Sequence, residues 1–345
     1  MIKANVTRTV LTRALTFRAK RLIVFLMPGY EYRSGGVLSI VRICEESAAL
    51  SHLHQARVAQ CIVPGDPRLL RYTWFENRNY MLDLESVLKR CRRLDYLLLH
   101  IPEGAVNQVL DWLTSASPTL MRNIRDVHLN VMAQNIDLIQ GHNVTGLLRF
   151  GKVTCTTAHE AYSNSATRAA LGVPLHRLGV CNGPEYYSRS DYQDKEPLLI
   201  VSIDEHPLKA QVLGRIAQAF PELKIQVIQD LHYEDYRKLI RRAKWSLTFG
   251  EGLDGYFTEP VFSGAVAFAV FNDRYFTPPF AKLETVYPSW EVLMEKIVAD
   301  IRRLDEPTAY NRCWQSAYDL MSEVINADRF RENLRSFYRG EYTFP

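Results

Sequence analysis

Short apolar runs alternate with longer amphipathic segments along most of the chain. RLIVFLMP, which starts at Arg21, is followed by the glycine-rich GYEYRSGG and by VLSIVRICEESAALSHL, whose apolar spacing is helical. Further strand-like runs are RVAQCIVPG, LDYLLLHIPEG, VHLNVMAQNIDLI and KVTCTTA, with helical stretches such as AVNQVLDWL between most of them. This alternation predicts an α/β fold in which helices cover both faces of a parallel sheet.

The pattern breaks near Asn182 and then restarts. NGPEYYSRSDYQDKEP is polar, aromatic and proline-bearing, without a sustained period, and it indicates a linker. EPLLIVSID, LKIQVIQ, KWSLTF and VAFAVFND then alternate with helices, and the rest is mostly helical. A chain of 345 residues also suits two domains. We therefore expect two doubly wound, Rossmann-like domains, with the following division: a basic arm 1–20, a first domain 21–182, a linker 183–197, a second domain 198–326, and a C-terminal helix 327–345 returning to the first domain.

Composition excludes several classes of protein. A formal net charge of +4 is too small to indicate nucleic-acid binding, and no nucleic-acid motif is present. No C-x-x-C occurs, so we expect buried free thiols in a reducing cytoplasm and no disulfide framework or zinc site. The six cysteines concerned are Cys44, Cys61, Cys91, Cys155, Cys181 and Cys313.

The first twenty residues contain five basic side chains and no acidic one. They lack the apolar core and cleavage site of a secretory signal, and no apolar run in the chain is long enough for a transmembrane helix. Three alternatives remain open: a solvated arm, a peripheral contact with an anionic membrane, and a less favoured organellar transit peptide.

FGEGLDGYFTEPVFSGAVAFAV places two glutamates, Glu251 and Glu259, between two apolar runs. Ligands of open parallel sheets bind at the carboxyl ends of the strands, so we expect a ligand site at this loop. Thr258 as N-cap and Pro260 in the first turn predict a short helix that ends at Gly264.

The N-terminus of such a helix favours phosphate. Glu259 in its first turn would accept hydrogen bonds from two neighbouring hydroxyls, such as those of a ribose. The alternative is that Glu251 and Glu259 are ordinary surface acids, which the buried apolar flanks disfavour.

The motif resembles that of the GT-B glycosyltransferases, specifically the retaining family-four type. That family has a glutamate, seven residues, a second glutamate and then a glycine five positions on, as Glu251, Glu259 and Gly264 do here. The resemblance covers nearly the full chain. It implies that the first domain binds the acceptor and the second the nucleotide sugar across a cleft, that Glu251 is catalytic and contacts the transferred sugar, and that Glu259 contacts the ribose. It also implies that the donor site includes Asp254, Gly255, Tyr256 and Thr258.

Other segments match the family in part. Arg33, Gly35 and Gly36 lie in a loop that resembles the family's glycine loop near the diphosphate or acceptor, although an ordinary strand–helix turn is an equal alternative. Lys209 matches the catalytic lysine that neutralises the departing phosphate, the alternative being a solvated lysine at a helix start. The base would be held by backbone around Gln229-Asp230-Leu231.

The chain departs from the family at two places. Asp204 stands five residues before Lys209, where the family usually has an arginine, so Arg33 or Arg274 would have to compensate the diphosphate charge. The second departure is at the end of the first-domain strand that here reads LNVMAQN, where the family often has a histidine.

This chain offers Gln134 and Asn135 instead, which resembles rhamnosyltransferase-like members. His100 and His159 are expected to end strands and are candidates to enter the cleft, although a lone histidine at a strand end more often has a structural role.

The resemblance implies transfer from a UDP, GDP or dTDP sugar with retention, through an oxocarbenium-like state and without metal or cofactor. The acceptor would be a glycan or lipid-linked glycan of a bacterial surface polysaccharide, such as O-antigen or capsule, made in the cytoplasm or on the inner face of the plasma membrane. YTWFENRNY, 72–80, is a candidate surface for stacking on sugars, or else a packed loop. KRCRR, 89–93, and YRKLIRRAK, 236–244, are either membrane contacts or solvated helix faces.

Competing interpretations stay open. An inverting transferase or an epimerase would use the same architecture, and Asp204 and the missing histidine fit a non-catalytic GT-B-like partner subunit. A nicotinamide dehydrogenase is disfavoured, because no G-x-G-x-x-G follows the first strand.

Overall fold

The computed structural model describes residues 2–16, 18–91, 93–115 and 118–345. The chain divides into two compact units. Unit 1 comprises Met1–Cys181 and Asp328–Pro345, and unit 2 comprises Asn182–Ala327. The chain therefore leaves unit 1 once and returns to it for its last helix.

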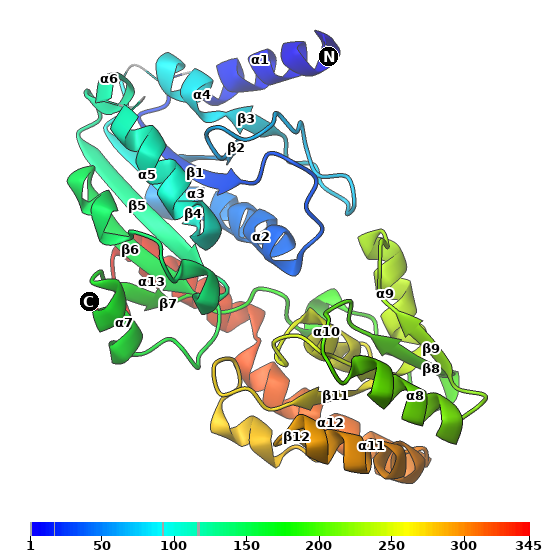
Figure 1. Ribbon diagram of the computed structural model, residues 1–345. Helices are drawn as coiled ribbons and strands as arrows, with labels where there is room; N and C mark the ends of the chain where they lie inside the picture. The colour runs from blue at the N-terminus through cyan, green and yellow to red at the C-terminus, as the bar shows by residue number, and fades with distance from the viewer. Residues whose placement is uncertain (1, 17, 92, 116–117) are drawn as a thin grey trace. The chain divides into compact units, whose positions relative to one another are not determined.

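Unit 1 is built on a parallel sheet of seven strands in the order β3-β2-β1-β4-β5-β6-β7 (Figure 1). The order reverses between β1 and β4, where open α/β sheets have their ligand crevice. The strands are β1 Arg21–Met27, β2 Arg57–Ile62, β3 Met81–Asp83, β4 Tyr96–Pro102, β5 Asp126–Ala133, β6 Lys152–Thr157 and β7 Leu175–Arg177.

Helices cover both faces of this sheet because its strands alternate their side chains. Leu22, Val24 and Leu26 of β1 pack in one core with α4 and α5, whereas Phe25 faces the opposite side. The helices of unit 1 are α1 Ile2–Thr16, α2 Gly35–Ala49, α3 Ser51–His54, α4 Leu84–Arg90, α5 Val106–Ser115, α6 Pro118–Met121, α7 Ser165–Leu171 and α13 Ala327–Arg339.

Five residues lie directly beside one another across five strands of unit 1, and we call them the central rung: Gln60, Phe25, His100, Asn130 and Thr154. All five are buried. The Asn130 amide donates to His100 Nδ1 at 3.0 Å, and the Thr154 hydroxyl donates to Asn130 Oδ1 at 2.9 Å. His100, Asn130 and Thr154 thus form a buried polar network within the sheet.

The C-terminal helix α13 covers this side of the sheet. The Phe337 ring lies 5.6, 5.8 and 5.9 Å from the imidazole centroids of His100, His128 and His176. His176 Nε2 also donates to the Asn333 carbonyl at 2.7 Å. Residues of three strands and of the C-terminal helix therefore form one packed layer within unit 1.

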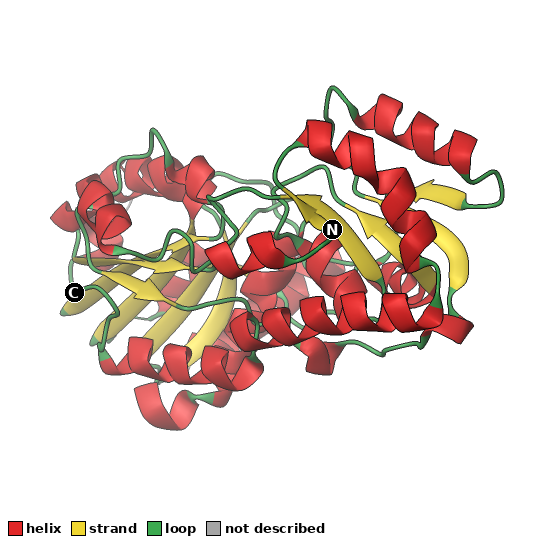
Figure 2. Cartoon of the chain, turned by 90° about the horizontal axis from the view of Figure 1, so that it is seen from below, coloured by secondary structure: helices red, strands yellow, loops and turns green. Residues whose placement is uncertain are grey.

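Unit 2 is a smaller parallel sheet in the order β12-β11-β10-β8-β9, which reverses between β8 and β10. Figure 2 shows its strands side by side with helices packed around them. Its elements are β8 Glu196–Val201, α8 Lys209–Ala219, β9 Lys224–Val227, α9 Tyr233–Arg242, β10 Ala243–Leu247, α10 Gly255–Phe262, β11 Val266–Val270, β12 Val286–Tyr287, α11 Trp290–Leu304 and α12 Pro307–Val324. Two parallel-sheet domains of α/β class are therefore confirmed.

The prediction of a solvated N-terminal arm is wrong for the described part of α1. Leu11 and Leu15 pack against the core of unit 1, and Thr12 is buried. The Arg8 guanidinium donates to the Arg68 carbonyl at 2.8 Å. Burial of one helical face outweighs the basic character of the segment, which the composition alone did not reveal. No helix among the described residues is both long and apolar enough to cross a bilayer.

The polar segment 183–197 packs as part of unit 2. Lys195 is buried, and its ammonium donates to the carbonyls of Ser263 at 2.7 Å and Arg241 at 3.0 Å. Burial, together with the nearby charge of Arg241, lowers the pKa of Lys195 to about 7. The lysine thus joins the ends of α9 and α10, where carbonyls lack helical partners.

Candidate functional site

The sites predicted in the second half of the chain lie on one edge of the unit 2 sheet. Lys209 follows β8, Gln229 and Leu231 follow β9, Glu251 follows β10 and Arg274 follows β11. Because these strands are parallel, the segments that follow them meet at the same edge, which we call the unit 2 edge. Gln229 and Arg274 are exposed there, and Glu251 is half-buried.

The helix after Glu251 begins earlier than predicted. Asp254 is its N-cap: Oδ1 accepts from the amides of Tyr256 at 2.8 Å and Phe257 at 3.1 Å. Asp254 Oδ2 accepts from the Thr248 hydroxyl at 2.6 Å. Thr258 lies inside the helix and donates back to the Asp254 carbonyl, so its predicted N-cap role is wrong. A carboxylate that accepts hydrogen bonds from two amides of the first turn is a stronger cap than the later hydroxyl.

Pro260 is likewise in the helix interior, not in the first turn. A proline has no N–H for the carbonyl four residues earlier, and the Ser246 hydroxyl of β10 donates to that Tyr256 carbonyl at 2.7 Å. The predicted stop at Gly264 is confirmed. Gly264 has φ +91, and the amide of Ala265 donates to the Pro260 carbonyl at 2.8 Å, as in a Schellman motif.

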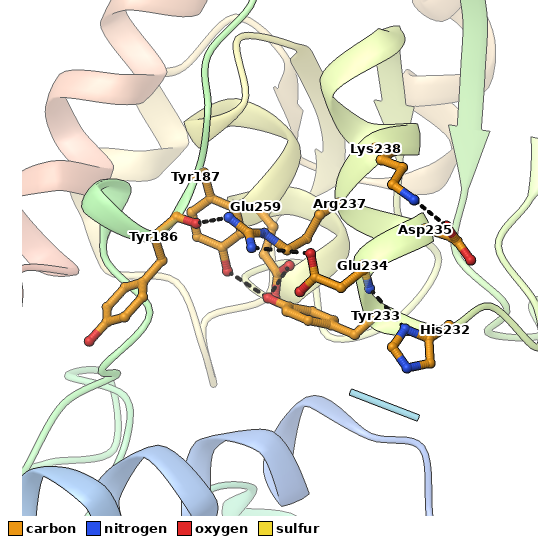
Figure 3. A network of polar contacts seen from close by, with 9 residues as sticks. All are labelled: Tyr186, Tyr187, His232, Tyr233, Glu234, Asp235, Arg237, Lys238 and Glu259. Carbon is orange, nitrogen blue, oxygen red and sulfur yellow. Dashed lines mark hydrogen bonds and ion pairs between the residues drawn. The ribbon is translucent and has the colours of Figure 1, made fainter. Parts of the chain in front are cut away.

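Glu259 is therefore in the second turn of α10 and only 6% exposed. Its Oε2 accepts from the Tyr233 hydroxyl at 3.2 Å, and the Tyr187 hydroxyl lies 3.3 Å from that of Tyr233 (Figure 3). Burial and then the charge of Glu259 raise the pKa of Tyr236 well above its usual value. Tyr233 begins α9 directly after the loop of Leu231, so two predicted nucleotide-contact segments meet here. The sequence analysis did not identify Tyr233 or Tyr187.

The basic run 236–244 is compensated within unit 2. Lys238 pairs with Asp235 at 2.8 Å (Figure 3), and Arg242 pairs with Glu196 at 2.7 Å. The ammonium of Lys244 lies 2.8 Å from a carboxylate oxygen of Asp305. These pairs fit the interpretation of a solvated helix face, because the acids cancel the positive charge that would attract an anionic surface.

Two carboxylates approach each other beside Glu251. A Cβ at Gly250 would meet Asp204 Oδ2 at 2.7 Å and Asp254 Oδ2 at 2.9 Å. Burial raises the pKa of Asp254 to about 6, while its bond from Thr248 opposes this shift and Asp204 adds to it. A side chain at position 250 would therefore displace one of these two carboxylates, and this end of β10 is acidic.

Lys209 folds back onto the end of β8. Its ammonium donates to the carbonyls of Ser202 at 3.0 Å, Ile203 at 3.1 Å and Asp204 at 2.7 Å. An ammonium has three N–H groups, so these bonds use its whole donor capacity. Lys209 is accordingly neither a solvated lysine nor an open phosphate donor in this conformation.

In unit 1 the structure brings together Gly36 of the glycine loop and Gln134. Gly35 and Gly36 open α2 behind the N-cap Ser34, and the Gln134 amide donates to the Gly36 carbonyl at 3.2 Å. A Cβ at Gly36 would lie 2.8 Å from Gln134 Oε1. Arg33 is exposed just before α2. The loop after β1 and the loop after β5 therefore form one surface at this edge of the sheet.

Asn135 is held by a buried acid that the sequence analysis missed. Glu103, directly after β4, accepts from the Asn135 amide at 3.0 Å. Burial raises the pKa of Glu103, and bonds from the backbone amides of Asn135, Glu103 itself and Gln134 lower it. His159 lies in the loop after β6, half-buried and 5.7 Å from the Tyr162 ring, and burial lowers its pKa to about 4.

The prediction that His100 enters a cleft is wrong. His100 lies inside β4, is 2% exposed, and stacks on Phe25 with ring centroids 4.2 Å apart. Burial lowers its pKa well below the usual value, as do the nearby His128 and His54. The residue stands within the central rung, two positions before the strand ends, so its side chain faces α13 and not the edge.

The aromatic segment 72–80 does not form a stacking surface either, because Tyr72, Trp74 and Phe75 are buried. The half-exposed aromatics in unit 1 are instead Tyr30 and Tyr32, in the glycine loop, with ring centroids 6.1 Å apart. The six cysteines are all buried and free, as expected. Among the described residues, no three His, Cys, Asp or Glu side chains are grouped as metal ligands.

Comparison with known proteins shows the fold. No protein-family model and no curated protein matches the chain. Sucrose-phosphate synthase from Thermosynechococcus elongatus matches with a TM-score of 0.59 at 10% identity, over 93% of this chain and 98% of that one. Anabaena HepE, solved with UDP-glucose, matches with a TM-score of 0.55 at 10% identity, over 92% and 99%. A DNA-modifying β-glucosyltransferase matches with a TM-score of 0.54 at 8% identity, over 93% and 99%. The chain has the GT-B fold.

Proposed function

We propose that the protein is a retaining glycosyltransferase that moves a sugar from a nucleoside diphosphate sugar to an acceptor hydroxyl. One observation supports this: Glu251 and the loop 229–231 follow parallel strands at the unit 2 edge of a GT-B fold, and Glu259 is bonded to Tyr233 just after that loop. Two of the matched structures, HepE and the β-glucosyltransferase, are described with UDP-glucose or uridine diphosphoglucose. The donor of this chain is accordingly a UDP sugar, or a GDP or dTDP sugar.

The ribose contact falls to Glu259. Tyr233 holds one carboxylate oxygen, and the other lies 3.2 Å from where a Cβ at Gly255 would stand. Because position 255 is a glycine, no side chain covers that oxygen from the first turn of α10. A carboxylate fixed in this way accepts hydrogen bonds from vicinal hydroxyls without a further cost of ordering. The base then lies against the exposed backbone around Gln229.

Glu251 positions the transferred sugar, because it follows β10 immediately and lies in the bend before α10. The bond between the anomeric carbon and the phosphate oxygen breaks with its electrons going to the phosphate. The acceptor oxygen bonds to the same face of that carbon, and its proton passes to the departing phosphate. This route needs no metal, no cofactor and no carboxylate nucleophile.

The acceptor is a glycan, which stacks on Tyr30 and Tyr32. These residues alternate with Glu31, whose carboxylate accepts from the amides of Thr73 at 2.9 Å and Trp74 at 3.1 Å. Both tyrosines are about half exposed, and the bonds of Glu31 tie the loop between them to residues 73 and 74. Rigid tyrosines offer apolar faces and hydroxyls to a sugar at small entropic cost. Bacterial surface polysaccharide synthesis, at the cytoplasmic side of the membrane, is the proposed setting.

The nucleotide contact is tested by a thermal-shift panel of UDP, GDP, dTDP, CMP and NAD. We expect one nucleoside diphosphate to stabilise the wild type, and Glu259→Ala to weaken its binding by about 1.5–3 kcal/mol, the cost of a lost charged hydrogen bond. Glu196→Ala is the matched control, because Glu196 starts β8 at the opposite edge of the same sheet. Equal affinity in folded Glu259→Ala and wild type would refute the ribose contact.

Catalysis is tested with Glu251→Ala, which should bind the bare nucleotide normally and lose transfer. The anomeric configuration of the product, read by NMR, separates retention from inversion, and release of an epimerised sugar would indicate an epimerase. A second candidate is a non-catalytic subunit that binds a nucleotide sugar. It is favoured because the Lys209 ammonium donates to backbone carbonyls and because Asp204 stands where the family usually has an arginine. That candidate predicts binding without turnover in the wild type.

A further inference from the structure

A diphosphate at the unit 2 edge would meet fewer donors than the sequence predicted. The Lys209 ammonium donates its three N–H groups to the carbonyls of residues 202–204. The carboxylate of Asp254 already accepts from the amides of Tyr256 and Phe257 in the first turn of α10. Asp204 adds a negative charge beside it. If the proposed function holds, another group must bind the terminal phosphate.

His206 lies in the loop between β8 and α8, two residues after Asp204 and three before Lys209. It is half-buried, and its ring stacks on Trp290 with centroids 4.1 Å apart. Trp290 in turn stacks on Phe249, two residues after β10, at 5.0 Å and an interplanar angle of 4°. The imidazole is therefore part of a rigid aromatic stack at the carboxyl ends of β8 and β10, beside the point where the strand order reverses.

Hydrogen bonding fixes which nitrogen of His206 is the donor. Nδ1 accepts from the amide of Leu208 at 3.2 Å. A neutral imidazole has one accepting and one donating nitrogen, so the proton is on Nε2. Within the described part of the chain, no protein acceptor is recorded for Nε2. The ring thus presents one oriented N–H to whatever occupies this edge.

We propose that His206 is a catalytic residue that donates its Nε2 hydrogen to the terminal phosphate of the nucleoside diphosphate, in place of the missing arginine at position 204. This inference rests on the proposed function and names the group that binds its leaving phosphate. As the bond to the sugar breaks, negative charge grows on the phosphate and the hydrogen bond strengthens.

The test compares ligands that differ only in phosphate. Titration calorimetry of the full chain is done with UDP and uridine, and in parallel with GDP and guanosine and with dTDP and thymidine. His206→Phe keeps a ring on Trp290 but removes the N–H, so we expect diphosphate affinity to fall about tenfold or more while nucleoside affinity is unchanged. His206→Gln, which retains an amide donor, should be intermediate. His52→Phe is the control, an exposed histidine of α3 in unit 1, away from the unit 2 edge.

A merely structural His206 would change both ligands together, and it would be revealed by equal losses for UDP and uridine. Trp290→Leu checks the stack: it should reproduce part of the diphosphate-specific loss because the imidazole is no longer held. If wild type binds a diphosphate and His206→Phe binds it equally well, this inference is overturned and the proposed function stands. If wild type binds none of the diphosphates, the proposed function fails and the role of His206 fails with it.

Discussion

The sheet of unit 1 buries a polar rung at its centre, whereas the buried strand positions of unit 2 are apolar except for Ser246. In unit 1, the buried Asn130 amide donates to His100 Nδ1 beneath α13. In unit 2 the polar groups instead follow the strands, as Glu251 and His206 do. One residue type therefore has different roles in the two units: a histidine within a strand supports packing, while one after a strand is available to a ligand.

The largest effect is expected at Asn130. Asn130→Ala removes three buried hydrogen bonds, to His100 Nδ1 and to the hydroxyls of Thr154 and Thr156. Thr154 keeps its bond with His128 Nε2. Leaving a buried polar group without its partner costs about 1–3 kcal/mol, so the free energy of unfolding should fall by about 3 kcal/mol. Calorimetry of the full chain measures this loss. Asn79→Ala, at a surface asparagine bonded to Glu45, is the control and should change little. A loss below about 0.5 kcal/mol at Asn130 would mean that the rung is not a structural network.

Acid should weaken unit 1 through its buried histidines. Burial, and then the charge of Lys152, lowers the pKa of His128 to about 3. The pKa values of His54, His100 and His176 are lowered as well, in each case chiefly by burial. An unfolded histidine titrates near 6.5, so the unfolded chain binds more protons below that pH. Stability is fully present above about pH 6.5 and is lost as the pH falls toward the folded values.

His128→Gln isolates this contribution. At 1.36 kcal/mol per pH unit, one such histidine costs the wild type about 2 kcal/mol between pH 6.5 and pH 5, and the variant should lose that much less over the same range. Unfolding at both pH values gives the difference. His52→Gln, at an exposed histidine of α3, should keep the wild-type pH dependence. Parallel curves for wild type and His128→Gln would show that His128 does not titrate on unfolding.

Gly264 in unit 2 and Gly36 in unit 1 should differ in how well they tolerate a side chain. Gly264 has φ +91, and a Cβ there would lie 2.3 Å from the Ser190 carbonyl oxygen, which is backbone. We expect Gly264→Ala to cost about 1.5 kcal/mol, the scale of a left-handed conformation in a residue with a side chain. A Cβ at Gly36 would meet only the mobile end of Gln134, at 2.8 Å. Thermal unfolding should therefore show a clear loss for Gly264→Ala and little for Gly36→Ala, and the reverse order would contradict the argument.

Apolar runs were sufficient to predict the long strands, because β1, β4, β8 and β10 are buried on both faces. The short strands β3, β7 and β12, of two or three residues, carry no such run and were missed. The edge residues of unit 2 were predictable because they follow parallel strands. The N-cap was not, because Asp254 and Thr258 are both good caps and only the geometry of the bend decides between them.

The smallest effect concerns Ser246, the exception to the apolar strands of unit 2. Its hydroxyl donates at 2.7 Å to the Tyr256 carbonyl, which lost its helical partner because residue 260 is a proline. Ser246→Ala should cost about 1 kcal/mol by leaving that carbonyl without a donor. In a Pro260→Ala background, residue 260 supplies the missing N–H, so the same substitution should cost much less. A double-mutant cycle on the free energy of unfolding measures this coupling. Equal costs in both backgrounds would mean that Ser246 does not replace the bond that Pro260 removes.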